Sequence, residues 1–440
     1  MKNADISAPK AAVLGLQHLL AMYSGSVLVP ILIGASLHFS SEQMTYLVSI
    51  DIFMCGVATA LQIFSNKIFG IGLPVVLGCA VQAVAPLILI GQKFDFQTMY
   101  GAIIAAGLFV FLIGGFFAKL RKLFPPLVTG TLITVIGLSL IPVAFQNLGG
   151  GSTTAKDFGS MTNLAVGAFT VLLILAFNVW GRGFVRSIAI LIGLIGGTVL
   201  AGFLGMVSFA PVAEASWFHV PTPFYFGVPH FEWSSIVTMI LISLVSMVES
   251  TGVFFALGDV VERKIESEDL KKGYRAEGLA VLLGGIFNTF PYTTFSQNVG
   301  LVQLSGIKTR KPVMFSALFL ILLGLLPKIG ALATIIPSPV LGGAMLVMFG
   351  MVAVQGIRML QQVDFHNDKN LLVAAVSIGL GLGVTTQPEI VQALPETLQL
   401  LFGSGILMAS VSAVLLNWIF NSKTPQPELE TKDGLNEKDE

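Results

Sequence analysis

Two neighbouring amides, Gln297 and Asn298, lie in the apolar segment FSQNVGLVQLSG. Removing an amide from water costs free energy unless it is hydrogen-bonded. The carbonyl and NH₂ groups of Gln297 could pair with adjacent C=O and N–H groups of a planar ring, while Asn298 could hold the backbone or orient its neighbour. An amide contact between membrane helices is the structural alternative. For the adjacent pair we favour ligand binding.

Acidic residues also interrupt apolar segments. Glu249 lies in VSMVESTGVFFALG and Glu277 in GYRAEGLAVLLGG, and a charge at mid-bilayer costs roughly 2.5–3.5 kcal/mol on insertion scales. Small residues follow Glu249, so it could approach a ligand, accept N–H donors and carry a proton. For Glu277 the alternative interpretation is an interfacial salt bridge with Arg275. His18 could donate to a buried acceptor or join two helices, and the role of Asp51 stays open.

Composition indicates the class of protein. The 440 residues are 54% hydrophobic and 11% charged, whereas soluble proteins carry about 25% charged residues. Apolar windows of about 20 residues recur along the chain, which favours an all-α polytopic membrane protein over a barrel. Cys55 and Cys79 have no metal-binding or C-x-x-C spacing, so the sequence predicts no metal site, cofactor or disulfide framework.

Fourteen membrane spans are predicted, and the distribution of basic residues supports their number. The approximate limits are 11–33, 43–64, 70–90, 99–118, 125–144, 162–179, 187–206, 234–258, 275–290, 293–307, 312–330, 337–356, 370–386 and 390–420. With both termini cytoplasmic, 21 of the 24 Lys and Arg residues are cytoplasmic and only Lys93, Lys156 and Lys328 lie outside. This is the expected positive-inside bias.

An internal repeat relates the two halves of the chain. PPLVTGTLITVIG (125–137) and SPVLGGAMLVMFG (338–350) match at one proline and two glycines with a constant offset. These segments are spans five and twelve, so the predicted unit has seven spans and its second copy is inverted, as in secondary transporters. The predicted domains are a first repeat (1–206), an extracellular connector (207–233), a second repeat (234–421) and a disordered cytoplasmic tail (422–440).

Spans three and ten are interrupted. Span three reads GIGLPVVLGCAVQAVAPLIL, and span ten follows Pro291 and reads YTTFSQNVGLVQL. They occupy equivalent places in the two repeats, and paired interrupted segments indicate a binding site near the bilayer midplane. Irregular backbone is tolerated there only where it is buried in protein or lines a cavity. The N-termini of the half-helices would offer N–H donors to a ligand.

At these residues the chain resembles a known family. GLQHLLAMYSG, VSMVESTG, GYRAEGLAVLLGGIFNTFPYTTFSQNVGLVQLSG and IPSPVLGGAMLVMFG resemble the nucleobase–ascorbate transporter (nucleobase:cation symporter-2) family, and within it the bacterial xanthine and uric acid permeases. The resemblance covers about residues 10–420. The family pattern in span ten, (Gln/Glu/Pro)-Asn-x-Gly-x₄-Thr-(Arg/Lys/Gly), matches Gln297 to Gly300 and then Ser305, which replaces the usual Thr. Gln at the first position is similar to purine-transporting members.

The resemblance implies a core domain of spans 1–4 and 8–11, a gate domain of spans 5–7 and 12–14, and short strands in spans three and ten. It also implies that Glu249 holds a ring N–H and that Gln297 is its partner from span ten. Asn298, Glu277 and His18 match further positions important for affinity or transport.

The resemblance places the backbone of four residues beside the bound base, namely Ala80, Val81, Phe295 and Ser296. The chain departs from the family in two places. Val81 and Gln82 stand where many members carry an aromatic Phe, and Val253 stands where several purine members carry an Asp.

The function expected from these observations is proton-coupled, elevator-type uptake of xanthine or uric acid, with Glu249 and Glu277 in proton coupling. Uracil or another nucleobase is the nearest alternative. An anion transporter of the same fold fits less well, because the predicted midplane carries acids and amides where an anion site would need a basic residue or paired helix N-termini. An enzyme or a receptor fits less well, since no nucleophile–base pair or ligand cluster is evident. The resemblance suggests a homodimer formed through the gate domain. We expect a bacterial plasma membrane protein with purine and lipid partners and no nucleic-acid partner.

Overall fold

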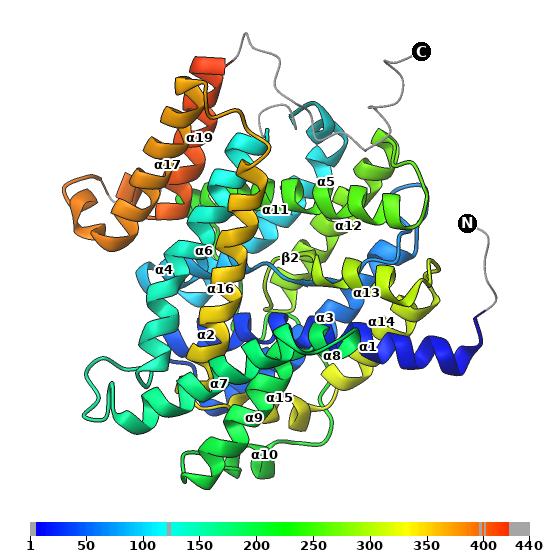
Figure 1. Ribbon diagram of the computed structural model, residues 1–440, viewed down its shortest axis with the longest axis vertical. Coiled ribbons are helices and arrows are strands. Elements are labelled where there is room, and N and C mark those ends of the chain that lie inside the picture. Colours follow the sequence, from blue (N-terminus) through cyan, green and yellow to red (C-terminus); the bar gives the residue numbers. More distant parts are fainter. Residues whose placement is uncertain (1–5, 121–124, 396–397, 400–401, 422–440) are drawn as a thin grey trace.

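The computed structural model describes residues 6–120, 125–395, 398–399 and 402–421, and it is almost entirely helical (Figure 1). The helices are α1 (Ala8–Ser26), α2 (Leu28–Ser36), α3 (Ser41–Ile63), η1 (Val81–Ala83), α4 (Val84–Lys93), α5 (Phe96–Leu120), α6 (Pro126–Leu148), α7 (Met161–Val179), α8 (Phe184–Ser187), α9 (Ala189–Phe203), α10 (Ala210–Glu214), α11 (Trp233–Val260), α12 (Ser267–Ile286), α13 (Gln297–Ser305), α14 (Lys311–Gly324), α15 (Pro327–Thr334), α16 (Ser338–Leu360), α17 (Asp368–Thr386), η3 (Pro388–Val391) and α19 (Gly405–Asn421). Two short strands, β1 (Leu77–Cys79) and β2 (Tyr292–Thr294), complete the fold.

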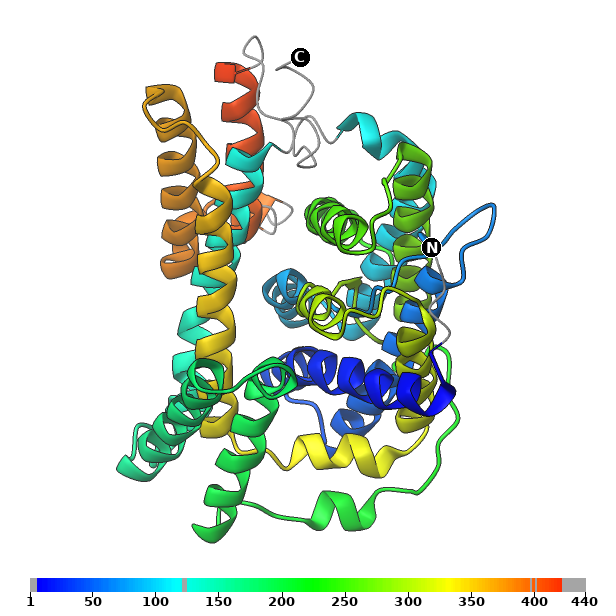
Figure 2. The same cartoon turned by 45° about the vertical axis from the view of Figure 1, so that its right-hand side comes forward.

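The helices pack as two groups. In one group α6 packs along α16, α17 packs along α19, and α7 contacts both α9 and α16. In the other, α5 packs along α12, α3 along α14, and α1 along α14. Figure 2 shows α6, α16, α17 and α19 along one side of the molecule, with α1, α3, α12 and α14 on the other. Helices from both halves of the sequence therefore build each group.

Among the described residues, eight helical stretches are long and apolar enough to cross a membrane, with α1 and α2 counted as one. The consecutive helices α14 and α15 form a further candidate, bent by 84°. Three shorter apolar helices, at 81–93, 189–203 and 405–421, also coincide with predicted spans. The number fourteen stays a prediction, because several predicted spans are broken or short helices here.

Several boundaries differ from those predicted. The helix of span nine begins at Ser267 instead of 275, because Glu266 and Asp269 form a capping box at its N-terminus. The last residue of the predicted connector, Trp233, begins α11, since Glu232 accepts hydrogen bonds from the N–H groups that follow it. The predicted tail at 422–440 lies outside the described residues.

The strands expected in spans three and ten are present and pair with each other. They are antiparallel, with Leu77 opposite Thr294 and Cys79 opposite Tyr292. Two flanking hydrogen bonds extend the pairing, from Ala80 N to the Pro291 carbonyl (2.8 Å) and from Phe295 N to the Val76 carbonyl (2.9 Å). Backbone groups cannot stay unpaired at membrane depth. The sheet therefore makes the two interruptions possible.

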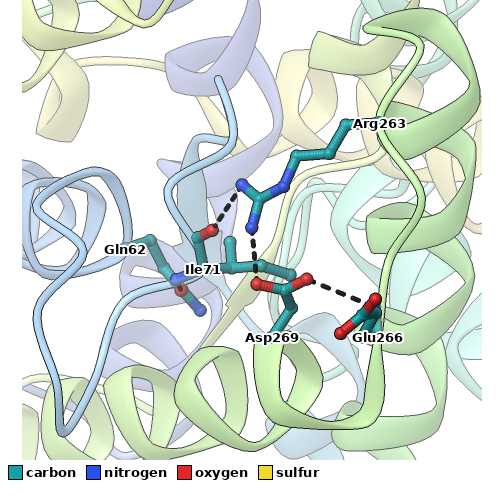
Figure 3. A network of polar contacts seen from close by, with 5 residues as sticks. All are labelled: Gln62, Ile71, Arg263, Glu266 and Asp269. Carbon is teal, nitrogen blue, oxygen red and sulfur yellow. Dashed lines mark hydrogen bonds and ion pairs between the residues drawn. The ribbon is translucent and has the colours of Figure 1, made fainter. Parts of the chain in front are cut away.

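A polar network fixes the segment that leads into β1 (Figure 3). The Arg263 guanidinium donates to the Ile71 carbonyl (3.1 Å) and to the Asp269 carboxylate, which also accepts the N–H of Glu266 (3.2 Å). The Ile71 N–H donates to the Gln62 amide oxygen (3.2 Å). The start of span three is thereby tied to α3 and to the first turn of α12.

The repeat-related helices α6 and α16 pack closely, and their matched glycines have different surroundings. A Cβ added at Gly137 would lie 2.3 Å from the backbone nitrogen of Ala353, and one at Gly130 would lie 3.0 Å from the Gly356 carbonyl oxygen. Gly350, the sequence counterpart of Gly137, has no atom within 4 Å of such a Cβ. The close contact between α6 and α16 thus requires a glycine at position 137, whereas position 350 has room for a side chain.

This asymmetry gives a matched pair of variants. Gly137→Val should lower the free energy of unfolding by about 1–3 kcal/mol, because its side chain would force α6 and α16 apart. Gly350→Val should stay within about 0.5 kcal/mol of wild type. Unfolding midpoints of the purified protein in detergent measure both. Equal losses in the two variants would contradict the packing described.

Candidate functional site

Glu249 lies in the middle of α11, where it is half-buried. The side-chain amide of Gln82, from η1, donates to the Glu249 carboxylate (3.1 Å) and to the Ser246 hydroxyl (2.7 Å). Because Ser246 and Glu249 are separated by about one helical turn, they share one face of α11. A residue of the interrupted span three thus donates one hydrogen bond to the Glu249 carboxylate. The carboxylate can accept further hydrogen bonds from other donors.

Gln297 begins α13 and is exposed. In the described chain its side chain is bonded only to the hydroxyl of its neighbour Ser296, at 3.3 Å. A glycine follows one turn after each polar residue, Gly252 after Glu249 and Gly300 after Gln297, and a Cβ at either glycine would meet nothing within 4 Å. Both polar groups therefore stand beside open space.

The backbone positions expected beside a ligand divide into two kinds. The N–H groups of Ala80 and Phe295 are already bonded in the extended strand pairing. Val81 begins η1, and Ser296 is the N-cap of α13. Since N–H groups in a first helical turn have no acceptor within their own helix, the donors available to a ligand lie at the starts of η1 and α13.

His18 and Asn298 contact each other and are both buried, at 3% and 1% exposure. The Asn298 amide donates to the His18 backbone carbonyl (3.2 Å), and its nitrogen lies 3.0 Å from His18 Nδ1. The bond joins α13 to α1. The buried Asn298 Oδ1 has no hydrogen-bond partner among the described residues. The neighbouring amides of span ten thus differ, with Gln297 facing open space and Asn298 packed between helices.

Glu277 is buried on α12. It contacts Ser250, the residue that follows Glu249 in the chain. The hydroxyl of Ser250 donates to Glu277 at 2.5 Å and lies 3.1 Å from the Thr293 hydroxyl of β2. Glu277 therefore connects to the sheet through Ser250. Arg275, its alternative partner on sequence grounds, forms no ion pair with it among the described residues and lies over the Phe111 ring.

Asp51, whose role the sequence left open, is 1% exposed and holds both strands. Its Oδ1 atom accepts from the Cys79 thiol of β1 (2.8 Å) and from the Tyr292 hydroxyl of β2 (3.0 Å). Cys79 and Tyr292 are opposite each other in the sheet, so their side chains lie on the same face. One oxygen of the Asp51 carboxylate thus connects Cys79 of β1 with Tyr292 of β2.

Two contributions were missed by sequence reasoning. Gln82 had been noted only as a departure from an aromatic position, although a lone amide in an interrupted apolar span is itself a signal. The anchoring role of Asp51 had no local signal, because its partners are 28 and 241 residues away. Glu249, Gln82 and Gln297 come from three separate elements.

Comparison with known sequences places the chain in a family of permeases. Residues 9–390 match the family model Xan_ur_permease, described as a permease family. The uric acid permease PucK of Bacillus subtilis (strain 168) is 54% identical over 419 residues, covering 95% of this chain and 97% of that protein. A xanthine permease of the same organism is 53% identical (97% and 98% covered), and the nucleobase transporter PlUacP of Paenibacillus larvae is 51% identical (93% and 94% covered).

Solved structures with a similar fold are more distant in sequence. The transmembrane domain of the cyanobacterial bicarbonate transporter BicA is 14% identical with a TM-score of 0.61, covering 92% of this chain and 97% of that one. The murine anion transporter Slc26a9 in an inward-facing state is 12% identical with a TM-score of 0.61, covering 95% and 69%. At this identity the similarity concerns the fold alone.

The two amides of span ten give a test of their different surroundings. Asn298→Ala should lower the free energy of unfolding by about 1–3 kcal/mol, because buried His18 acceptors lose their donor. Gln297→Ala, at the adjacent exposed position, should change it by no more than about 0.5 kcal/mol. Thermal unfolding of the purified variants measures this. A large loss at Gln297 with none at Asn298 would reverse the assignment.

Proposed function

Since the chain belongs to the nucleobase–ascorbate transporter family and is a multi-pass membrane permease, not an enzyme, we propose that it takes up oxidised purines, xanthine or uric acid. The observation that carries the proposal is the position of Glu249, Gln82 and Gln297. Glu249 on α11 and Gln82 on η1 are hydrogen-bonded to each other, and Gln297 begins α13 in the other interrupted span. A Cβ added at Gly252 or at Gly300, one turn beyond Glu249 and Gln297, would meet no atom within 4 Å.

The chemistry of these groups fits an oxidised purine. Xanthine and uric acid present ring N–H donors beside C=O acceptors. The Glu249 carboxylate accepts N–H donors, while the Gln297 amide supplies one acceptor and one NH₂ donor. The helix starts at Val81 and Ser296 add backbone N–H groups suited to a carbonyl oxygen or a partly anionic ring. Several relatives carry the names of xanthine and uric acid permeases, in agreement with this chemistry.

We further propose that uptake is coupled to protons and needs no other cofactor. Glu249 accepts the ligand N–H groups and takes up the coupling proton, and Glu277 supports it through Ser250, the residue next to Glu249. The group containing α3, α11, α12 and α13 acts as a mobile core, and the group containing α6, α7, α16 and α17 as a gate against which it moves. We also propose that two copies of the chain form a homodimer through the gate group. Membrane lipid surrounds the protein.

The proposed topology follows from charge. Both termini face the cytoplasm and fourteen spans cross the bacterial plasma membrane in a 7+7 inverted repeat, which puts 21 of 24 Lys and Arg residues inside. The first repeat occupies 1–206 and the second 234–421, with the connector 207–233 outside and the tail 422–440 inside.

Anion transport is the alternative that the solved neighbours raise, and uracil transport is the alternative within the family. An anion site needs a positive group or converging helix N-termini. The segments 233–260, 77–92 and 292–305 contain no Lys or Arg, and Glu249 lies among them. This local charge favours an uncharged or weakly acidic ring that carries N–H donors. Gln at position 297 resembles purine members and disfavours uracil.

Uptake in proteoliposomes tests the proposed activity. Radiolabelled xanthine should accumulate when the interior is alkaline, and a protonophore should abolish the accumulation, while exchange of sodium for potassium should leave it nearly unchanged. Unlabelled urate should compete more strongly than uracil. Strict dependence on sodium would contradict proton coupling, and equal competition by uracil would contradict the purine assignment.

Glu249 provides the sharpest variant. Glu249→Gln keeps the shape of the side chain but directs an NH₂ group at ligand N–H donors, so xanthine binding should weaken by about 1–3 kcal/mol. Because the variant cannot take up a proton at this position, its remaining binding should vary less with pH than that of wild type. Calorimetry on purified protein at several pH values measures both effects.

Glu249→Asp is the matched control. It preserves the carboxylate but shortens its reach by one methylene group, and it should retain partial binding and the pH dependence. Wild-type affinity and an unchanged pH profile in Glu249→Gln would exclude Glu249 from both ligand binding and proton coupling.

A further inference from the structure

A second cluster of reactive side chains contacts both strands of the sheet. It consists of Asp51 and Cys55 on α3 and Cys79 on β1, all three buried. Their ligand atoms lie within 4.8 Å of one another. Both thiols are free, and the 440-residue sequence contains no other cysteine. The cluster therefore combines one carboxylate with every thiol of the protein.

The geometry is close to that of a metal site. Asp51 and Cys55 are four residues apart, so they share one face of α3. The Cys79 sulfur lies 2.8 Å from Asp51 Oδ1, and the Cys55 sulfur lies 4.0 Å from Asp51 Oδ2. In a tetrahedral site with metal–sulfur bonds of about 2.3 Å and metal–oxygen bonds of about 2.0 Å, neighbouring sulfur and oxygen ligands are about 3.5 Å apart. The two observed separations lie on either side of this value.

Two hydroxyl groups surround the cluster. The Tyr292 hydroxyl lies 3.0 Å from Asp51 Oδ1, and the Ser26 hydroxyl lies 3.7 Å from the Cys55 sulfur. The Ser26 hydroxyl also accepts the backbone N–H of Cys79 at 2.8 Å. Groups of this kind orient metal ligands from outside the coordination shell.

We propose that Asp51, Cys55 and Cys79 form a binding site for a thiophilic divalent cation of the Zn²⁺ and Cd²⁺ class. Two thiolates with one carboxylate suit such ions, whereas Mg²⁺ and Ca²⁺ require all-oxygen shells. On binding, two metal–sulfur bonds and one metal–oxygen bond form. The two thiol protons are released to water.

The bound cation affects the sheet because its ligands already hold the strands. A metal between α3 and β1 cross-links these elements and withdraws Asp51 Oδ1 from Tyr292 on β2. The pairing of β1 with β2 positions the start of η1, where Gln82 donates to Glu249, and the start of α13 at Gln297. Occupation of the site therefore inhibits transport, and this consequence, unlike binding itself, rests on the proposed function.

Binding is tested with Cd²⁺ on the untagged, full-length protein in detergent. Equilibrium dialysis should give one tightly bound Cd²⁺ per chain, and X-ray absorption at the cadmium edge should show two sulfur ligands with oxygen in the remaining positions. A coordination shell of oxygen and nitrogen alone, or no stoichiometric binding, would overturn the proposal. This measurement uses the wild-type protein, so it tests metal binding even if substitutions in the sheet impair folding.

Variants then assign the ligands. Cys55→Ser and Cys79→Ser should each weaken Cd²⁺ binding by more than about 10-fold, since loss of an outer-shell partner alone costs 10- to 100-fold. The double variant lacks all thiols and should lose the sulfur signal together with the stoichiometric site. Stoichiometric binding to the double variant with the affinity of wild type would place the metal elsewhere.

Transport provides a separate readout. Cd²⁺ should inhibit xanthine uptake by wild type, a chelator should restore it, and the double variant, measured relative to its own metal-free uptake, should resist inhibition. Inhibition that is equal in both proteins would refute the link between this site and transport. If xanthine is not transported at all, the proposed function fails while the dialysis and absorption results still stand.

Discussion

The need to satisfy backbone hydrogen bonds at two interruptions inside the membrane governs the rest of this structure. Spans three and ten stop being helical at positions where no water can compensate. The pairing of β1 with β2, extended by Ala80 with Pro291 and by Phe295 with Val76, supplies the missing partners. Neither strand is stable alone, so neither interruption could exist without the other. Both halves of the chain are therefore needed to build the candidate site.

Buried acids hold this sheet in place. Asp51 binds the thiol and hydroxyl of the facing pair Cys79 and Tyr292, while Glu277 contacts Thr293 through Ser250. Ser250 also accepts a hydrogen bond from Thr294, so the two acids act on different residues of β2: Asp51 on Tyr292, and Glu277, through Ser250, on Thr293 and Thr294. Each buried carboxylate is costly unless hydrogen-bonded. The hydrogen bonds that satisfy these carboxylates also hold the sheet in place. The position of the sheet in turn determines where η1 and α13 begin.

Local chemistry determined what could be predicted from sequence. The interruptions, the acid at 249 and the amide at 297 all violate the apolar character of their own segments, so each was visible without a fold. Contacts across long separations were not visible: Gln82 meets Glu249 167 positions away, and Asn298 meets His18 280 positions away. Cys55 and Cys79 have no metal-binding spacing in the sequence, yet the pairing of β1 places them together beside Asp51.

The helix scaffold and the candidate site have separate requirements. The resemblance to the structures of the bicarbonate transporter BicA and the anion transporter Slc26a9 concerns the helix arrangement alone, at 12–14% identity. In this chain the first turns of η1 and α13 offer backbone N–H groups, which favour a carbonyl or an anion. The Glu249 carboxylate on α11 lies beside η1, where Gln82 donates to it, and it repels a full negative charge. Under the proposed function, an oxidised purine meets both requirements, because it carries N–H donors and C=O acceptors on one rigid ring.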